Sequence, residues 1–177
     1  RQLDDDVLRI IYEHHEHCDG SGYPQQLREA SIGRLSRIVC IANHFDNLCN
    51  PVDPRVALSP HEALARMFLP QYRVRFDDVA LKAFIRCMGV YPPGSLVQLE
   101  DERYALVLGM HPTLPMKPTL IVYDPAVPKE EALIVNLEAE PKLAIASSMR
   151  PSQLPPAALE YLNPRQQLTY YVDPRRR

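Results

Sequence analysis

Three histidines and two acids gather in the segment HHEHCDGSGYP, residues 14–24, directly before a glycine-rich bend that closes on Tyr-Pro. Imidazole suits iron, manganese, zinc and nickel, and carboxylates add charge and harder oxygen ligands. The adjacent His14 and His15 point about 100° apart on a helix. Each therefore reaches a different metal of a two-metal cluster, or one binds while its neighbour packs. Two-metal sites polarise phosphate oxygens and produce hydroxide near neutral pH.

The same segment has a second interpretation that involves no metal. A histidine-rich helix end is a favourable C-terminal turn, because cationic side chains complement the helix dipole. No HExxH motif is present, and His44, His61 and His111 stand alone in the sequence. Spacing by itself favours the solvated helix end.

Helical signals surround this segment. Asp4, Asp5 and Asp6 suit a helix N-terminus, and the apolar spacing after them predicts a helix that ends at residues 19–22, where glycine readily takes the left-handed position. Residues 31–50 predict a strong amphipathic helix, broken by Pro51 and Pro54. Its apolar residues at helical spacing are Ile32, Leu35, Ile38, Val39, Ala42, Phe45 and Leu48. Capping signals predict a third helix over residues 59–69, and residues 76–89 predict a fourth.

After residue 89 the helical spacing of apolar residues gives way to short runs of β-forming residues. Four short β-type runs, SLVQL, RYALVLGM, TLIVYD and ALIVNL, are separated by glycine, proline or acidic turns. They predict a small antiparallel sheet or a partly closed barrel, and the tail predicts one short helix and an extended end. The expected fold class is α+β, with a helical domain over residues 1–90 and a β-rich extension over residues 91–177.

Composition narrows the classes of protein. The 177 residues carry a net charge of -2, so no broad basic surface is expected for a nucleic acid polymer or anionic lipid. No apolar run approaches the roughly 20 residues of a membrane span, and no signal peptide is found. The four cysteines show no CxxC pairing, which favours reduced thiols and a cytoplasmic location. Because the first residue is Arg1 and a helix is already under way by Val7, the chain is expected to be a fragment.

The stretch HHEHCDGSGYPQQL resembles the HH-E-x-x-DG-x-GYP-x-G-L signature of the HD-GYP domain. IGRLSRIVCIANHFDNL resembles the next helix of that family, and FDDVALKAFIRCMGVYPPGSLVQL resembles its closing helix and the segment after it. The resemblance covers nearly the whole chain, and the first motif is highly specific. It implies the helical fold of the HD phosphohydrolases, present in part, and hydrolysis of the bacterial second messenger cyclic di-GMP.

The resemblance also assigns roles to residues. It implies that His14 and His15 are ligands of a metal cluster, of iron or manganese, and that Asn43 occupies a metal-binding position. It places Asp19, Gly20, Gly22, Tyr23 and Pro24 in the loop that shapes the nucleotide site. Glu16 is expected to orient the imidazoles without binding the metal itself. Arg37 and Asp46 match the next helix, where Arg37 faces substrate or forms a structural pair with Asp46.

Three departures from the family pattern stand out. The family has a metal-binding aspartate where this chain has Asn43, which keeps an oxygen donor but loses the charge; Val39 and Ala42 are expected to face the core beside it. The glycine after G-Y-P-x is Gln26, which would alter the bend of the loop. The segment CNPVDPRVAL replaces an arginine- and tyrosine-bearing stretch. The family's His-Asp dyad and further ligands precede the paired histidines and are absent from the sequence.

We therefore expect a metal-dependent phosphodiesterase domain that hydrolyses cyclic di-GMP in bacterial signalling, incomplete over these residues. The alternative is a degenerate HD-GYP module that binds cyclic di-GMP or a protein partner of the signalling pathway without catalysis. A different HD-type hydrolase is disfavoured by the GYP loop.

Overall fold

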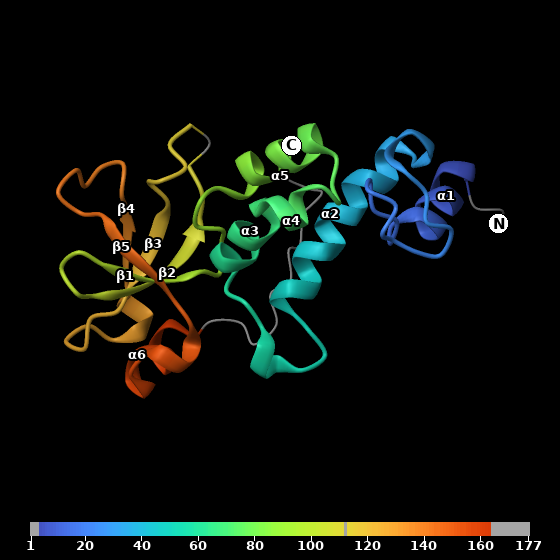
Figure 1. Ribbon diagram of the computed structural model, residues 1–177. Helices are drawn as coiled ribbons and strands as arrows, with labels where there is room; N and C mark the ends of the chain where they lie inside the picture. The colour runs from blue at the N-terminus through green and yellow to red at the C-terminus, as the bar shows by residue number, and fades with distance from the viewer. Residues whose placement is uncertain (1–3, 112, 164–177) are drawn as a thin grey trace.

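The computed structural model describes residues 4–111 and 113–163, and Figure 1 shows helices at one end of the molecule and a sheet at the other. The helices are α1 (Asp5–Glu13), α2 (Arg34–Cys49), α3 (Pro60–Phe68), α4 (Pro70–Arg73) and α5 (Asp78–Met88). The strands are β1 (Leu96–Leu99), β2 (Tyr104–Gly109), β3 (Thr119–Val122), β4 (Leu133–Asn136) and β5 (Ile145–Met149), followed by α6 (Pro156–Leu162). The predicted α+β class is confirmed.

Local signals explain where the helices begin. The carboxylate of Asp4 accepts the backbone N–H of Asp6 at the start of α1, and Asp77 accepts that of Ala80 at the start of α5. Ser59 and Glu62 form a reciprocal capping box at α3. These caps satisfy backbone donors that have no partner inside the helix.

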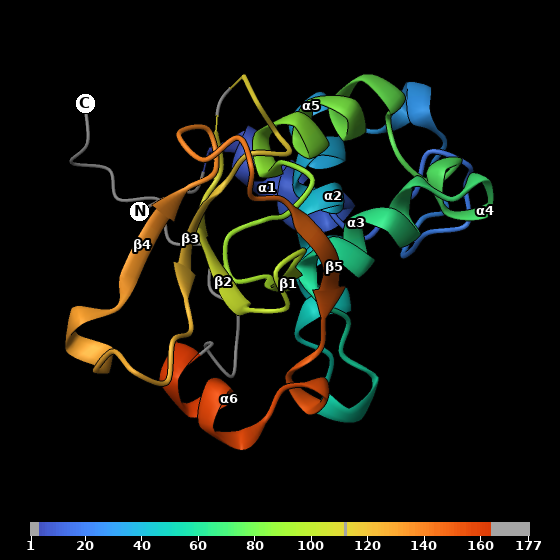
Figure 2. The same cartoon turned by 90° about the vertical axis from the view of Figure 1, so that its left-hand side faces the viewer.

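The sheet is antiparallel, with strand order β4-β3-β2-β1-β5, so β4 and β5 are its two edges. The predicted antiparallel sheet is thus confirmed in its open form. Strand β5, with the sequence IASSM, was not predicted, because its small polar residues carry no strand pattern. Figure 2 shows α6 against one end of the strands, where Leu154, Ala158 and Leu162 pack with Leu96.

The helical core lies between α2, α3 and α5. Its fully buried members include Ile41, Phe45, Met67 and Leu81. The predicted apolar stripe of α2 is only partly correct: Ile32 and Phe45 are buried, whereas Leu35, Ile38 and Ala42 are exposed and Val39 is half-buried. The expectation that Ala42 faces the core is therefore wrong. The reason is that α2 buries Ser36, Cys40 and Ile41 instead, on a neighbouring side of the helix.

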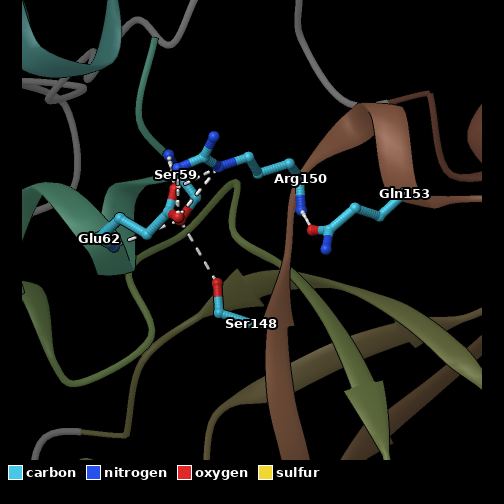
Figure 3. Close-up of polar contacts among 5 residues, drawn as sticks. All are labelled: Ser59, Glu62, Ser148, Arg150 and Gln153. Carbon is cyan, nitrogen blue, oxygen red and sulfur yellow. Dashed lines mark hydrogen bonds and ion pairs between the residues drawn. The ribbon is translucent and has the colours of Figure 1, made fainter. Parts of the chain in front are cut away.

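A polar junction joins the sheet to the helices at α3 (Figure 3). The guanidinium of Arg150 donates to Glu62 at 2.8 and 3.0 Å, and Ser148 Oγ lies 3.4 Å from Ser59 Oγ. Gln153 accepts the backbone N–H of Arg150 at 2.6 Å and so orients this arginine. The β5 edge is thereby fixed to the start of α3.

The predicted division at residue 90 lies between α5 and β1, and it stays a prediction. In the described part of the chain, every helix is too short or too polar to cross a membrane. The extended end expected for the tail lies outside the described residues.

Candidate metal and nucleotide site

His14 caps the C-terminus of α1, and its imidazole is fixed by the helix it ends. Nδ1 lies 3.1 Å from the carbonyl of Ile10 and 2.9 Å from that of Ile11. Carbonyl oxygens only accept hydrogen bonds, so Nδ1 carries the proton. The lone pair of the neutral ring is therefore on Nε2, which is the form that can ligate a metal.

His15 lies between three side chains. Its ring is stacked on Tyr23 with centroids 4.7 Å apart, and the His14 centroid is 3.9 Å away. The amide nitrogen of Asn43, on α2, lies 3.3 Å from His15 Nδ1. Burial, and then the charge of His14, lower the pKa of His15. The structure brings together His14, His15, Tyr23 and Asn43.

The orientation of the Asn43 amide controls the tautomer of His15. An amide nitrogen only donates, so in this arrangement Nδ1 of His15 accepts and its Nε2 carries the proton. Turning the amide by 180° would present its oxygen to an Nδ1–H and free Nε2 for a metal. A carboxylate at residue 43 could only accept, and would hold the ring in the second form.

The GYP loop is folded back against the end of α1. Glu16 is 1% exposed, and its carboxylate accepts the backbone N–H groups of Gln25 at 2.5 Å and Leu27 at 2.9 Å. A Cβ on Gly22 would collide with the backbone of residues 15–17, so only glycine fits there. Glu16 therefore supports the site by holding the loop, and no hydrogen bond connects it to an imidazole among the described residues.

The loop presents its remaining predicted residues at the surface. Tyr23 is 59% exposed although it stacks on His15, and Pro24 is exposed. Asp19 accepts the backbone N–H of Ser21 at 2.9 Å, and Gly20 has φ +81°, in the left-handed region. An exposed aromatic face beside two imidazoles is an arrangement on which a nucleobase can stack.

Gln26, the departure noted in the loop, has φ +56°. This left-handed conformation costs an L-residue free energy that glycine does not lose. The loop therefore still bends at residue 26, although a glutamine stands there in place of the family's glycine.

Arg37 and Asp46 are occupied by partners other than each other. Arg37 Nη1 donates to Asp77 at 2.6 Å and to Glu29 at 3.1 Å, whereas Asp46 accepts from the Asn50 amide at 2.8 Å. The Arg37–Asp77 pair joins α2 to the cap of α5. In this structure Arg37 thus connects α2 to Glu29 and to Asp77 at the start of α5.

Two further histidines, not among the predicted site residues, lie beside the site. His17 Nδ1 is 2.9 Å from Ser21 Oγ, and the His17 and His44 centroids are 6.2 Å apart. Burial, followed by the charges of His17 and Arg75, lowers the pKa of His44 to about 4. Spacing along the chain carries little signal for His44, because its neighbours Tyr72 and Phe76 come from a distant segment.

The donor set near His14 and His15 is partial. Within residues 4–111 and 113–163, no group of three or more histidine, cysteine or acidic side chains is placed to hold a metal ion. Two imidazoles and a neutral amide do not by themselves fit a two-metal cluster, which needs bridging or charged oxygen ligands. The described residues supply at most part of such a site.

A helical unit that places paired histidines beside a glycine-containing loop is the class of arrangement expected of an HD-type phosphohydrolase. Comparison with known proteins agrees, since residues 1–79 match the HD domain family. The helical part of the chain is thus similar to the HD domain family, and the resemblance to the HD-GYP domain is confirmed.

Three curated relatives have similar sequences. Cyclic di-GMP phosphodiesterase PA4108 of Pseudomonas aeruginosa is 31% identical over 123 residues, which are 70% of this chain and 29% of that protein. Cyclic di-GMP phosphodiesterase response regulator RpfG of Xanthomonas campestris is 36% identical over 77 residues, 44% of this chain and 20% of that protein. 3'3'-cGAMP-specific phosphodiesterase 1 of Vibrio cholerae is 33% identical over 89 residues, 50% of this chain and 21% of that protein. The matched part of the chain thus spans less than a third of the length of each of these relatives.

Proposed function

We propose that this chain is part of a metal-dependent phosphodiesterase that hydrolyses cyclic di-GMP in bacterial signalling. The observation that carries the proposal is the grouping of His14, Asn43 and the exposed Tyr23 around His15, in a chain similar to two cyclic di-GMP phosphodiesterases. The third relative acts on a related cyclic dinucleotide by its name. The substrate class is therefore a cyclic dinucleotide, and cyclic di-GMP is the proposed member.

Each residue has a defined part in this proposal. Tyr23 stacks on a guanine base, and the loop of Asp19, Gly20, Gly22 and Pro24 frames the nucleotide. His14 contributes Nε2 as a metal ligand, and His15 contributes its Nε2 once the Asn43 amide has turned.

Iron or manganese is the proposed metal, which would polarise the phosphodiester and supply a nucleophilic hydroxide. Because the described donor set is partial, the remaining ligands come from outside the described residues. The place of action is proposed to be the cytoplasm, which the four free cysteines support.

The test separates binding from turnover. The 177-residue polypeptide should not hydrolyse cyclic di-GMP with iron or manganese, because its donor set is partial. The natural gene product should hydrolyse it, and His14→Ala and His15→Ala should each lower its bound metal by elemental analysis without loss of helix by circular dichroism. His111→Ala, in a loop of the sheet, is the matched control.

Two outcomes contradict parts of this proposal. Normal metal content in a double His14→Ala, His15→Ala variant would remove the ligand assignment. Cyclic di-GMP binding without any turnover by the natural protein would identify a binding module instead.

A further inference from the structure

Strand β4 forms an edge of the sheet that the described part of the chain leaves uncovered. It pairs with β3 on one side, and its Leu133 and Ile134 are 42% and 68% exposed. The other edge, β5, is held against α3 by the pair of Arg150 and Glu62. Figure 2 shows β4 at the outer side of the sheet, with the turn that precedes it next to α6. Within residues 4–111 and 113–163, β4 thus presents an open edge.

The backbone of β4 turns hydrogen-bond donors toward this open side. The N–H of Leu137 donates to the carbonyl of Pro118, just before β3. Bonded and non-bonded positions alternate in an antiparallel pair, so the N–H groups of Ile134 and Asn136 point away from β3. Exposed edges are usually protected by lysine, proline or a bulge, because free N–H groups are a template for another strand. The sequence LIVN of β4 has neither lysine nor proline, and its pairing with β3 is regular.

Acidic side chains stand at both ends of this edge. Glu130 and Glu131, the first acidic pair, precede β4, and Glu138 and Glu140, the second acidic pair, follow it. All four are exposed, and among the described residues their one ionic contact is that of Glu138 with His111, at 3.1 Å. The edge therefore has the order acidic, apolar, acidic, and a matching cover would be basic, apolar, basic.

Residues 164–177, the tail PRQQLTYYVDPRRR, have this matching order and lie outside the described residues. Arg165 precedes the run LTYYV, and the last three residues are all arginine, while Asp173 is the one acid. Aromatic and β-branched residues such as those of LTYYV favour strands. Ten positions separate Arg165 from Arg175, and the same interval separates Glu130 from Glu140.

Helix α6 delivers the tail to the start of β4. The hydroxyl of Tyr161 donates to the carbonyl of Pro128 at 3.5 Å, and Lys129 Nζ donates to the carbonyl of Glu160 at 3.2 Å. Pro128 and Lys129 directly precede the first acidic pair, and α6 ends at Leu162. An extended chain rises about 3.3 Å per residue, so the five residues before LTYYV span up to about 16 Å. The tail therefore begins within reach of β4.

We propose that the tail docks along β4 as an added strand, with Arg165 beside the first acidic pair and the last three arginines beside the second. The run LTYYV then covers Leu133 and Ile134, and its carbonyls accept the free N–H groups of the edge. The added strand is parallel to β4, because the tail starts at the end where β4 starts. Addition of a strand to an open sheet edge is an established mode of peptide docking.

Charge favours the tail over a second copy of the chain. Two β4 edges paired antiparallel would set the first acidic pair of one chain against the second acidic pair of the other, and opposed like charges destabilise a sheet. Segments that complete the metal site belong beside His14 and His15, whereas Figure 1 places α1 and β4 at opposite ends of the molecule. The inference goes beyond the phosphodiesterase function and does not rest on it.

The experiment is amide hydrogen exchange of the 177-residue chain, followed residue by residue by NMR. We expect the N–H groups of Ile134 and Asn136 to exchange at least about tenfold more slowly than in a variant with Glu130→Lys and Glu131→Lys. High salt should reduce this difference, because it screens exposed charges.

A charge swap and a matched control make the result specific. Arg165→Glu, added to the variant with two lysines, should restore slow exchange at both amides. Glu100→Lys with Glu102→Lys is the control, since these glutamates are also exposed but lie on the turn between β1 and β2. It should leave the exchange of the β4 amides unchanged.

Cross-linking tests the direction of the added strand. In a Cys87→Ser background with oxidised glutathione, Asn136→Cys should form an intramolecular disulfide faster with Val172→Cys than with Gln167→Cys. The reverse order would overturn the parallel arrangement. Rapid exchange at both β4 amides of the unmodified chain overturns the proposal, and so does a charge swap that restores nothing. Protection that rises with protein concentration also overturns it, because it would identify a second copy as the cover.

Discussion

The side-chain amide of Asn43 on α2 lies 3.3 Å from Nδ1 of His15 at the end of α1, and this contact joins two segments 28 residues apart. The family pattern places an aspartate at this position. A carboxylate would accept from Nδ1–H, whereas the amide nitrogen donates to the Nδ1 lone pair. The exchange of one side-chain atom therefore changes which ring nitrogen of His15 is free.

We predict that Asn43→Asp moves the proton of His15 from Nε2 to Nδ1. The measurement is the nitrogen chemical shifts of the His15 ring at neutral pH, compared with those of His14, which should not change. In the natural gene product the same substitution should tighten metal binding by about tenfold, since a gain of about 1.4 kcal/mol is a small part of one added charge contact. Unchanged tautomer and metal stoichiometry would show that residue 43 does not act on His15.

Gln26 tests the loop independently of any metal. Its φ of +56° strains an L-residue, so Gln26→Gly should raise the free energy of unfolding by about 0.5–1 kcal/mol, after the larger entropy that glycine loses on folding is subtracted. Urea denaturation of the two proteins measures this difference. Gln25→Gly is the matched control, which should destabilise the chain because residue 25 has no positive φ. A loss of stability in Gln26→Gly would contradict the assignment of strain.

Features of the fold and of the site could be predicted from the sequence where they depend on residues close together along the chain. Capping residues located α1 and α3 because each cap bonds a backbone group only two or three residues away. The paired histidines and the loop were found for the same reason, since Gly22 returns the chain to residues 15–17. Arg37 was different. Its partner Asp77 is 40 residues away, whereas the family resemblance offers Asp46 on the same helix as the alternative to a substrate-facing role. Strand β5 was missed because pairing with β1, and not its own composition, makes it a strand.

His44 should make the stability of the chain sensitive to acid. Burial, then the charges of His17 and Arg75, lower its pKa to about 4, from the usual 6.5 of an unfolded histidine. The unfolded state therefore binds a proton first as pH falls below 6.5. Stability is full above that pH and declines toward pH 4, by at most about 1.4 kcal/mol per pH unit. His44→Leu should flatten this decline in urea titrations between pH 4 and 7. An unchanged slope would mean that other groups cause it.

The junction between sheet and helices gives the last prediction. Glu62 both caps α3, by accepting the N–H of Ser59, and binds Arg150 at the end of β5 (Figure 3). Arg150→Ala removes only a half-exposed ion pair and should cost little stability, whereas Glu62→Ala also removes the cap and should cost about 1–2 kcal/mol.

Burial raises the pKa of Glu62, but hydrogen bonds from Arg150 and Ser59 outweigh it and leave the pKa below 4.5. A lowered carboxyl pKa stabilises the fold above pH 4.5 and loses that contribution as pH falls through the folded value. The difference in unfolding free energy between wild type and Arg150→Ala, measured by urea denaturation, should therefore shrink as the pH falls below 4.5 and through the folded pKa of Glu62. Equal costs for the two substitutions would show that Glu62 does not serve both contacts.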